Sequence, residues 1–201
     1  MGKGAKIGLG IVVFLIVVVV VTIASLKNIY NGLVQLDEST NQAWAEVQSQ
    51  YQRRYDLIPN LVNTVKGYAA HEKETLQGVT EARAKLGGVT QLSAKDLTPE
   101  NLAKFQQAQA GLSSALQRLM VVTERYPDLK ANQNFINLQD ELSGTENRIT
   151  VARRRFNTAV QGYNQTIRQI PQVFIANVMG LQAKAYFEAE DSAQSAPKVE
   201  F

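Results

Sequence analysis

The hydrophobic and polar positions change pattern sharply after residue 26. Residues 7–26 form an unbroken apolar run without charge or proline, bracketed by Lys6 and Lys27. About 20 residues at roughly 1.5 Å each make a helix of about 30 Å, the thickness of the hydrocarbon core of a bilayer. A cleaved secretory signal has a shorter apolar region of roughly 7–15 residues and small residues at its cleavage site. We therefore predict an uncleaved transmembrane helix over 7–26, after a short tail over 1–6.

Beyond this run, apolar residues recur mostly three and four positions apart, which is typical of amphipathic helices. Residues 28–58 carry one such stripe, continuous with the apolar run, and residues 59–86 carry a second. Pro59 separates them, either as a tight reversal with Asp56 capping the second helix or as a kink within one long helix. The similar lengths of the two stripes favour the reversal, whereas the lack of an adjacent glycine favours the kink.

Two further helices are expected in the second half of the chain. Thr98 is a suitable N-cap, Pro99 suits the first helical position, and the apolar stripe that follows ends at Tyr126. A last helix is expected over 129–170 with a sustained heptad pattern, which indicates a coiled-coil-like bundle seam. Pro171 ends this helix.

These elements predict an all-α protein: a transmembrane helix followed by an antiparallel up-and-down four-helix bundle over 28–170. In the alternative open at Pro59, the first two bundle helices are one long kinked helix. Residues 171–190 carry many apolar side chains and suit either a membrane-skimming stretch or a strap packed on the bundle. Residues 191–201 have the composition of a disordered tail.

The amino-acid composition limits which catalytic and metal sites the chain can form. The chain has no cysteine, one histidine (His71) and a formal net charge of +3. The lack of cysteine excludes disulfides and thiolate catalysis, and a single histidine removes most catalytic triads and zinc sites. No Glu-x-x-His sequence is present, so the di-iron site of some helical bundles is not expected. We expect no enzymatic activity, no metal, no cofactor and no nucleic-acid partner.

Charged side chains near the stripes are the candidate site residues. Arg53, Arg54 and Asp56 cluster before Pro59, while Glu146 and Arg153 lie seven positions apart and share a helix face. They suit cross-helix ion pairs that fix register or, alternatively, a polar docking surface. The full candidate set is Arg53, Arg54, Asp56, Pro59, Asn60, Glu72, Arg83, Glu146, Arg148 and Arg153.

Three sequence blocks carry a family resemblance. The first is AWAEV at 43–47 followed by QRRYDLIPNLV at 52–62. The second runs from VKGY at 65–68 through HE at 71–72 to EARA at 81–84. The third runs from YPDLKAN at 126–132 through GTENRI at 144–149 to YN at 163–164. With the N-terminal apolar run, they resemble the LemA family of bacterial membrane proteins. One departure is Ile170, where the family pattern leads us to expect phenylalanine, and this exchange keeps an apolar side chain. The resemblance implies a single-pass inner- or plasma-membrane protein with a helical bundle and no established enzymatic activity. It also suggests association with membrane quality-control proteases.

Lysines on the amino side of the apolar run, followed by Asp37 and Glu38 beyond it, favour a cytoplasmic N-terminus and an extracytoplasmic bundle. The leading hypothesis is a non-enzymatic, membrane-anchored scaffold or adaptor that contacts the bilayer and other envelope proteins and self-associates. The alternative is a sensory or ligand-binding membrane-anchored domain. An enzyme acting through Glu72 and Glu146 is the least favoured reading. The sequence names no partner, pathway or oligomeric state.

Overall fold

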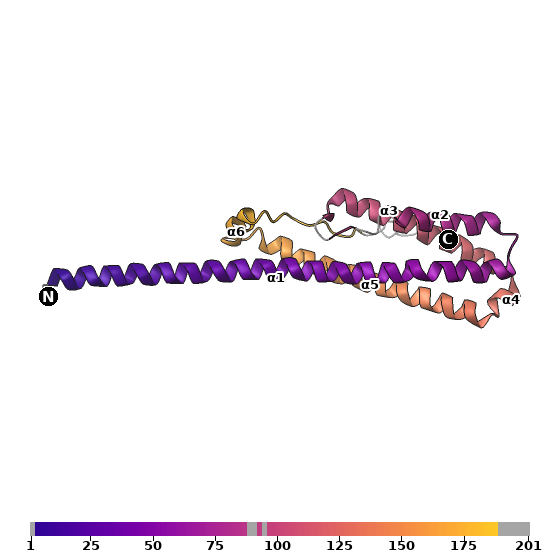
Figure 1. The fold of residues 1–201 in the computed structure, drawn as a ribbon, viewed down its shortest axis with the longest axis horizontal. Helices are drawn as coiled ribbons and strands as arrows, with labels where there is room; N and C mark the ends of the chain where they lie inside the picture. Colours follow the sequence, from indigo (N-terminus) through magenta and orange to yellow (C-terminus); the bar gives the residue numbers. More distant parts are fainter. Residues whose placement is uncertain (1–2, 88–91, 94–95, 189–201) are drawn as a thin grey trace, which may run out of the picture. The chain divides into compact units, whose positions relative to one another are not determined.

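A computed structural model describes residues 3–87, 92–93 and 96–188 (Figure 1). These residues form helices and no strand, which confirms the predicted all-α class. The helices are α1 (Lys3–Tyr68), α2 (Lys73–Gly87), α3 (Pro99–Thr123), α4 (Pro127–Lys130), α5 (Gln133–Thr166) and α6 (Gln172–Val178). The predicted disordered tail over 191–201 lies outside the described residues.

The chain divides into two compact units. The stem unit comprises Met1–Ser39 and Gln161–Ala183, and the bundle unit comprises Thr40–Val160 and Lys184–Phe201. Helices α1 and α5 contribute residues to both units.

Helix α1 runs for 66 residues and contains Pro59 in its interior, so the predicted reversal at Pro59 is wrong. Asp56 therefore lies within a helix rather than at an N-cap, and its carboxylate accepts a hydrogen bond from Gln52. A proline inside a helix leaves the carbonyl four residues earlier without its usual donor. Here that carbonyl belongs to Tyr55, and the Arg83 side chain supplies a donor to it at 3.2 Å. This compensation from α2 is a physical reason why the helix continues.

The reversal occurs ten residues later. The Glu72 amide donates to the Ala69 carbonyl at 3.1 Å in the turn that joins α1 to α2. The contact of Arg83 with Tyr55 then shows that α2 runs back along α1. The single helix predicted over 59–86 is therefore two helices separated by this turn.

Helices α3 and α5 complete the bundle. At one end of the bundle unit, Tyr126 after α3 bonds Glu72, and Asn132 before α5 bonds Tyr68 at the end of α1. Toward the other end, Arg155 of α5 pairs with Glu46 of α1 at 2.6 Å. The four helices α1, α2, α3 and α5 therefore run up, down, up and down, as predicted.

The observed helix ends show which local signals decide them. Thr98 caps α3 by accepting a hydrogen bond from the Asn101 amide, with Pro99 at the start of the helix, as the sequence predicted. The single last helix predicted over 129–170 is wrong. It is divided because Asn132 caps α5 by accepting from the Phe135 amide at 3.1 Å.

The bundle core has two apolar clusters. The first, the Ile58 cluster, contains Ile58, Leu112 and Phe135. The second, the Trp44 cluster, contains Trp44, Phe105 and Phe156. Helix α2 has only 15 residues and contributes to the first cluster alone. In the second cluster, side chains after α2 and after α6 pack instead, namely Leu97 and Phe187.

The stem unit has its own small core. Leu33 of α1 packs with Tyr163 and Ile167 from the end of α5 and with Ala176 of α6. Residues 9–28 of α1 are exposed throughout, and within the described part of the chain α1 is the one helix long and apolar enough to cross a membrane. Helix α1 already includes residues 3–6 of the predicted tail.

Candidate interaction site in the bundle

Arg54 is the most deeply buried charged side chain of the described bundle, with 3% of its surface exposed. Its guanidinium donates to Glu146 of α5 at 2.8 Å, to Ser113 of α3 at 3.2 Å and to Gln109 of α3. It also lies 5.3 Å from the centre of the Tyr51 ring on its own helix. One arginine thus connects α1, α3 and α5.

The position of Arg54 follows from helix geometry. Tyr51, Arg54 and Ile58 are spaced three and four residues apart, so they share the buried face of α1. Tyr51 belongs to the Trp44 cluster and Ile58 to the Ile58 cluster, so Arg54 forms a polar layer between the two. An arginine stays charged when buried and requires hydrogen-bond acceptors from its neighbours. The layer therefore favours a single register of the three helices.

A second polar cluster lies where α1 turns into α2. The Glu72 carboxylate accepts from the Tyr126 hydroxyl at 3.0 Å and pairs with Arg125 at 3.0 Å. The hydrogen bond to Glu72 is the main reason that the pKa of Tyr126 is raised, because the neutral hydroxyl is the donor. Glu72 thereby joins the turn after α1 to the turn after α3.

Other candidate residues have separate contacts. Arg53 pairs with Glu141 of α5 at 2.5 Å on the surface, and Arg148 donates to Thr145 of its own helix. The Arg153 guanidinium donates to the Glu188 carbonyl and lies 4.9 Å from the Phe187 ring centre. Glu146 and Arg153, whose seven-residue spacing predicts a shared helix face, thus have different partners.

For two further candidates, Asn60 and Pro59, the described contacts give little support for a binding role. Asn60 is exposed, and its backbone carbonyl accepts from the Thr64 hydroxyl. Pro59 acts through the backbone of α1. The structure therefore brings together Arg54 with Glu146, but does not gather the candidates into one site.

Sequence reasoning missed several contacts of equal weight. The Trp44 indole donates to the Leu92 carbonyl at 2.9 Å, and the Asn157 amide exchanges two hydrogen bonds with the Phe187 backbone. A signal for Arg54 was present in the sequence, because Gln109 lies between Phe105 and Leu112 on the apolar stripe of α3. A buried polar residue in such a stripe requires a polar partner.

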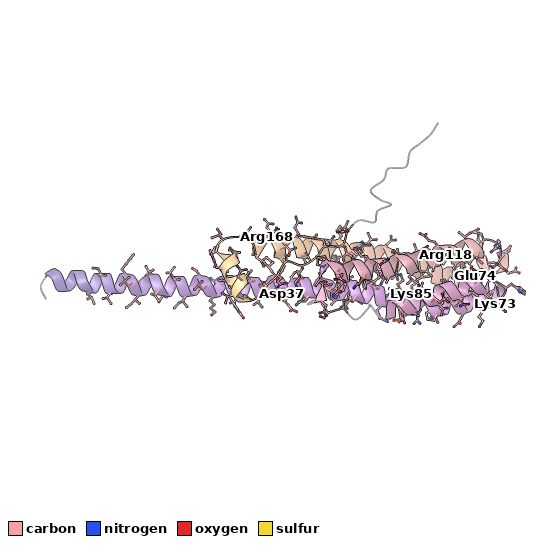
Figure 2. All side chains as sticks on the ribbon, turned by 90° about the horizontal axis from the view of Figure 1, so that it is seen from above. Asp37, Lys73, Glu74, Lys85, Arg118 and Arg168 are labelled. Atoms are coloured by element: carbon pink, nitrogen blue, oxygen red, sulfur yellow. The ribbon has the colours of Figure 1, made fainter. Side chains whose placement is uncertain are left out.

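A surface groove of about 470 Å³ lies between α2 and α3. It is lined by Glu74 and Glu81 from α2 and by Arg118 from α3, and Figure 2 labels Glu74 and Arg118. Its mixed charges suit a polar ligand or peptide. Across the described residues, no three His, Asp or Glu side chains gather as metal ligands.

Comparison with known proteins gives a consistent set of similarities. Residues 43–201 match the sequence profile of the LemA family. The chain is 27% identical over 193 residues to magnetosome protein MamQ 2 of Paramagnetospirillum magneticum, covering 88% of this chain and 71% of that protein. It is 26% identical over 182 residues to protein LemA of Metamycoplasma hominis, covering 89% and 79% respectively. Magnetosome protein MamQ of Magnetospirillum gryphiswaldense is 26% identical over 185 residues, covering 83% and 67%.

Proposed function

Because the chain belongs to the LemA family, we propose that it is a non-enzymatic, membrane-anchored scaffold or adaptor of the bacterial envelope. The single observation that carries this proposal is the composition of α1. The same helix presents an exposed apolar stretch over 9–26 and contributes Arg54 to the polar layer of the bundle. Contiguous exposed apolar surface of this extent is typical of a membrane or protein interface.

The proposed anchor is a single membrane span in the inner or plasma membrane. The lysines before the apolar stretch favour a cytoplasmic N-terminus, which puts the bundle on the extracytoplasmic side. Since the chain has no cysteine, Gln117→Cys on the exposed surface of α3 introduces a single label site. A membrane-impermeant maleimide should label it in intact spheroplasts, and should label the control Ala5→Cys only after lysis. The reverse pattern would place the bundle inside.

The proposed adaptor role is supported by how the bundle uses its charges. Arg54, Glu72 and Arg83 all contact other helices or turns of the bundle and so stabilise its form. The exposed helix surfaces around them are the ones that we propose bind other proteins. This reading includes self-association and membrane quality-control proteases as candidate partners.

Site-specific photocrosslinking in native membranes tests the adaptor role. A photoreactive amino acid at Asn60, Gln117 or Val121 samples different exposed positions of α1 and α3. The proposal expects a defined crosslinked protein either from Asn60 on α1 or from the face of α3 that Gln117 and Val121 share, with little product from the other face. Recovery of uncrosslinked monomer from every position would contradict a scaffold.

A ligand-binding domain is the second candidate, and the groove between α2 and α3 favours it. If the groove binds a polar ligand, a library screen should find compounds that raise the melting temperature. Glu81→Gln and Arg118→Gln should abolish this shift, because both side chains line the groove. Thr158→Ala, on the exposed surface of α5, is the control and should keep the shift. If no compound in the library raises the melting temperature, the ligand-binding function is ruled out.

A further inference from the structure

Helix α6 is apolar on two sides, and among the described residues only one of these sides packs on protein. Ile175, Ala176 and Met179 pack on the core of the stem unit. On another side, Ile170, Phe174 and Val178 are 79%, 65% and 89% exposed. The spacing of four residues aligns Phe174 and Val178 on one face of α6, with Ile170 just before the helix. Three large apolar side chains so exposed form a patch that requires an explanation.

The place of α6 along α1 indicates what covers this patch. Ile29 of α1 packs against the same small core as α6. Ile29 lies three residues beyond Leu26, the last residue of the apolar run, which is roughly 4.5 Å along the helix. The polar layer on each side of a bilayer is about 5–8 Å thick, given hydrocarbon and total thicknesses of roughly 30 and 40–45 Å. Leu33 and Leu36 of the same core lie seven and ten residues beyond Leu26, so the core that α6 packs on begins at the level of the lipid headgroups if the apolar run spans the membrane.

Figure 1 agrees with this placement within the stem unit. Helix α6 lies beside α1, at the side of the α5 end that faces the N-terminal apolar part of α1. Tyr30, one turn beyond Leu26, is 50% exposed. Half-exposed tyrosines are enriched at the membrane–water interface, where the ring and hydroxyl face different environments.

The charges of this segment also suit a lipid surface. Residues 161–183 contain no aspartate or glutamate, and Arg168 is their one charged residue. Arg168, labelled in Figure 2, comes four residues before α6 begins. A phosphate-bearing surface repels carboxylates and attracts a guanidinium, so the composition matches phospholipid headgroups.

We propose that Ile170, Phe174 and Val178 dock on the bilayer surface around the membrane helix, at the boundary of headgroups and acyl chains. This inference rests on the proposed membrane anchor. The contact is that of an interfacial amphipathic segment, with its apolar side in lipid and its other side on protein. It gives the stem unit a second attachment to the bilayer besides α1.

Tryptophan quenching by brominated phospholipid tests the proposal with the full chain. The chain has one tryptophan, Trp44, which is 1% exposed and supplies a constant background. Phe174→Trp is compared with Val121→Trp, an apolar residue of α3 with a similar exposure of 71%. In phosphatidylcholine and phosphatidylglycerol vesicles, brominated lipid should quench the introduced tryptophan at 174 about twofold or more. The fluorescence of the tryptophan introduced at 121 should change little on addition of brominated lipid.

The outcomes are distinguishable. Vesicle flotation and circular dichroism first establish that each variant is inserted and helical, and Val178→Trp replaces Phe174→Trp if the latter misfolds. Floating protein with equal quenching at 174 and 121 would overturn the docking proposal but leave the anchor intact. A tryptophan at 174 shielded from both iodide and brominated lipid would also overturn it, because a second copy or another protein would then cover the patch. Failure of the wild-type chain to float would contradict the anchor and this inference together.

Discussion

Arg83 donates a hydrogen bond from its Nε to the Tyr55 carbonyl, the acceptor that Pro59 leaves without a helical donor. The same guanidinium lies 3.8 Å from the centre of the Tyr55 ring. The side chain from α2 thus replaces a missing main-chain bond of α1 and packs on the residue that carries it. This explains how α1 passes through a proline, and why an arginine in α2 matters to α1.

The first prediction follows from this replacement. Arg83→Ala should lower the free energy of unfolding by about 1–3 kcal/mol, because a partly buried carbonyl loses its donor. In a Pro59→Ala background, residue 59 regains an amide that donates to Tyr55. The same Arg83→Ala substitution should then cost about 1 kcal/mol less.

The measurement is a double-mutant cycle by urea unfolding of the full chain in detergent. Arg154→Ala, an exposed arginine of α5, is the control and should change stability by about 0.5 kcal/mol or less in both backgrounds. Strict additivity of Pro59→Ala and Arg83→Ala would show that the two residues act independently.

The second prediction concerns the buried arginine. Arg54→Ala should cost about 3–5 kcal/mol, because it removes a buried side chain and leaves Gln109 and Ser113 facing a gap. Glu146→Gln should cost less, since the Glu146 side chain is 54% exposed and glutamine still offers an acceptor. Arg53→Ala is the matched control, because the neighbouring Arg53–Glu141 pair is on the surface and is worth about 1 kcal/mol or less.

Chemical denaturation of the three variants checks this order. Equal losses for Arg54→Ala and Arg53→Ala would show that burial of Arg54 does not control its contribution. A crosslinking yield that falls with Arg54→Ala and not with Glu146→Gln would indicate that bundle register controls partner binding.

The all-α class and a helix cap could be predicted from the sequence, whereas the contacts between side chains of different helices could not. The Thr98 cap and the all-α class follow from residues adjacent in the chain. Asn132 carried a comparable signal, and its capping role was missed because the helix was expected to begin at residue 129, before Asn132. The expected reversal at Pro59 failed for another reason: its compensation comes from Arg83 in a different helix. One sequence could show that Gln109 and Arg54 are polar residues on apolar stripes, but not that they meet.

The third prediction concerns alkaline pH and Tyr163. Burial, and then the negative charge of Asp37, raise the pKa of Tyr163 to about 12. An unfolded tyrosine ionises near pH 10, as judged from model compounds. Because the folded pKa is the higher one, the contribution of the neutral hydroxyl to stability is complete below about pH 10 and is lost as pH rises toward 12. Its hydrogen bond to the Gln182 carbonyl at 3.0 Å is lost with it.

Melting temperatures measured from pH 8 to 12 test this assignment. Tyr163→Phe should flatten the part of the decline that Tyr163 causes. Tyr30→Phe, at a half-exposed tyrosine, is the control for the loss of a hydroxyl group. All other side chains are the same in the wild type and in Tyr163→Phe, so the difference between their profiles isolates Tyr163. Parallel pH profiles for the wild type and Tyr163→Phe would contradict the assigned role.

The fourth prediction concerns the segment that follows α6. Phe187 is 5% exposed, and its ring stacks on Trp44 with centres 6.0 Å apart and meets Phe156 at 5.5 Å. Phe187→Ala should lower stability by about 3–5 kcal/mol, since it opens a cavity in the Trp44 cluster. The emission of Trp44 should also shift to longer wavelength, because water gains access to the indole. Tyr186→Ala is the matched control: its side chain is 41% exposed, so it should leave both the emission and the unfolding midpoint nearly unchanged. If Phe187→Ala left the Trp44 emission unaltered, this segment would not cover the core in solution, and α1, α3 and α5 would enclose Trp44 by themselves.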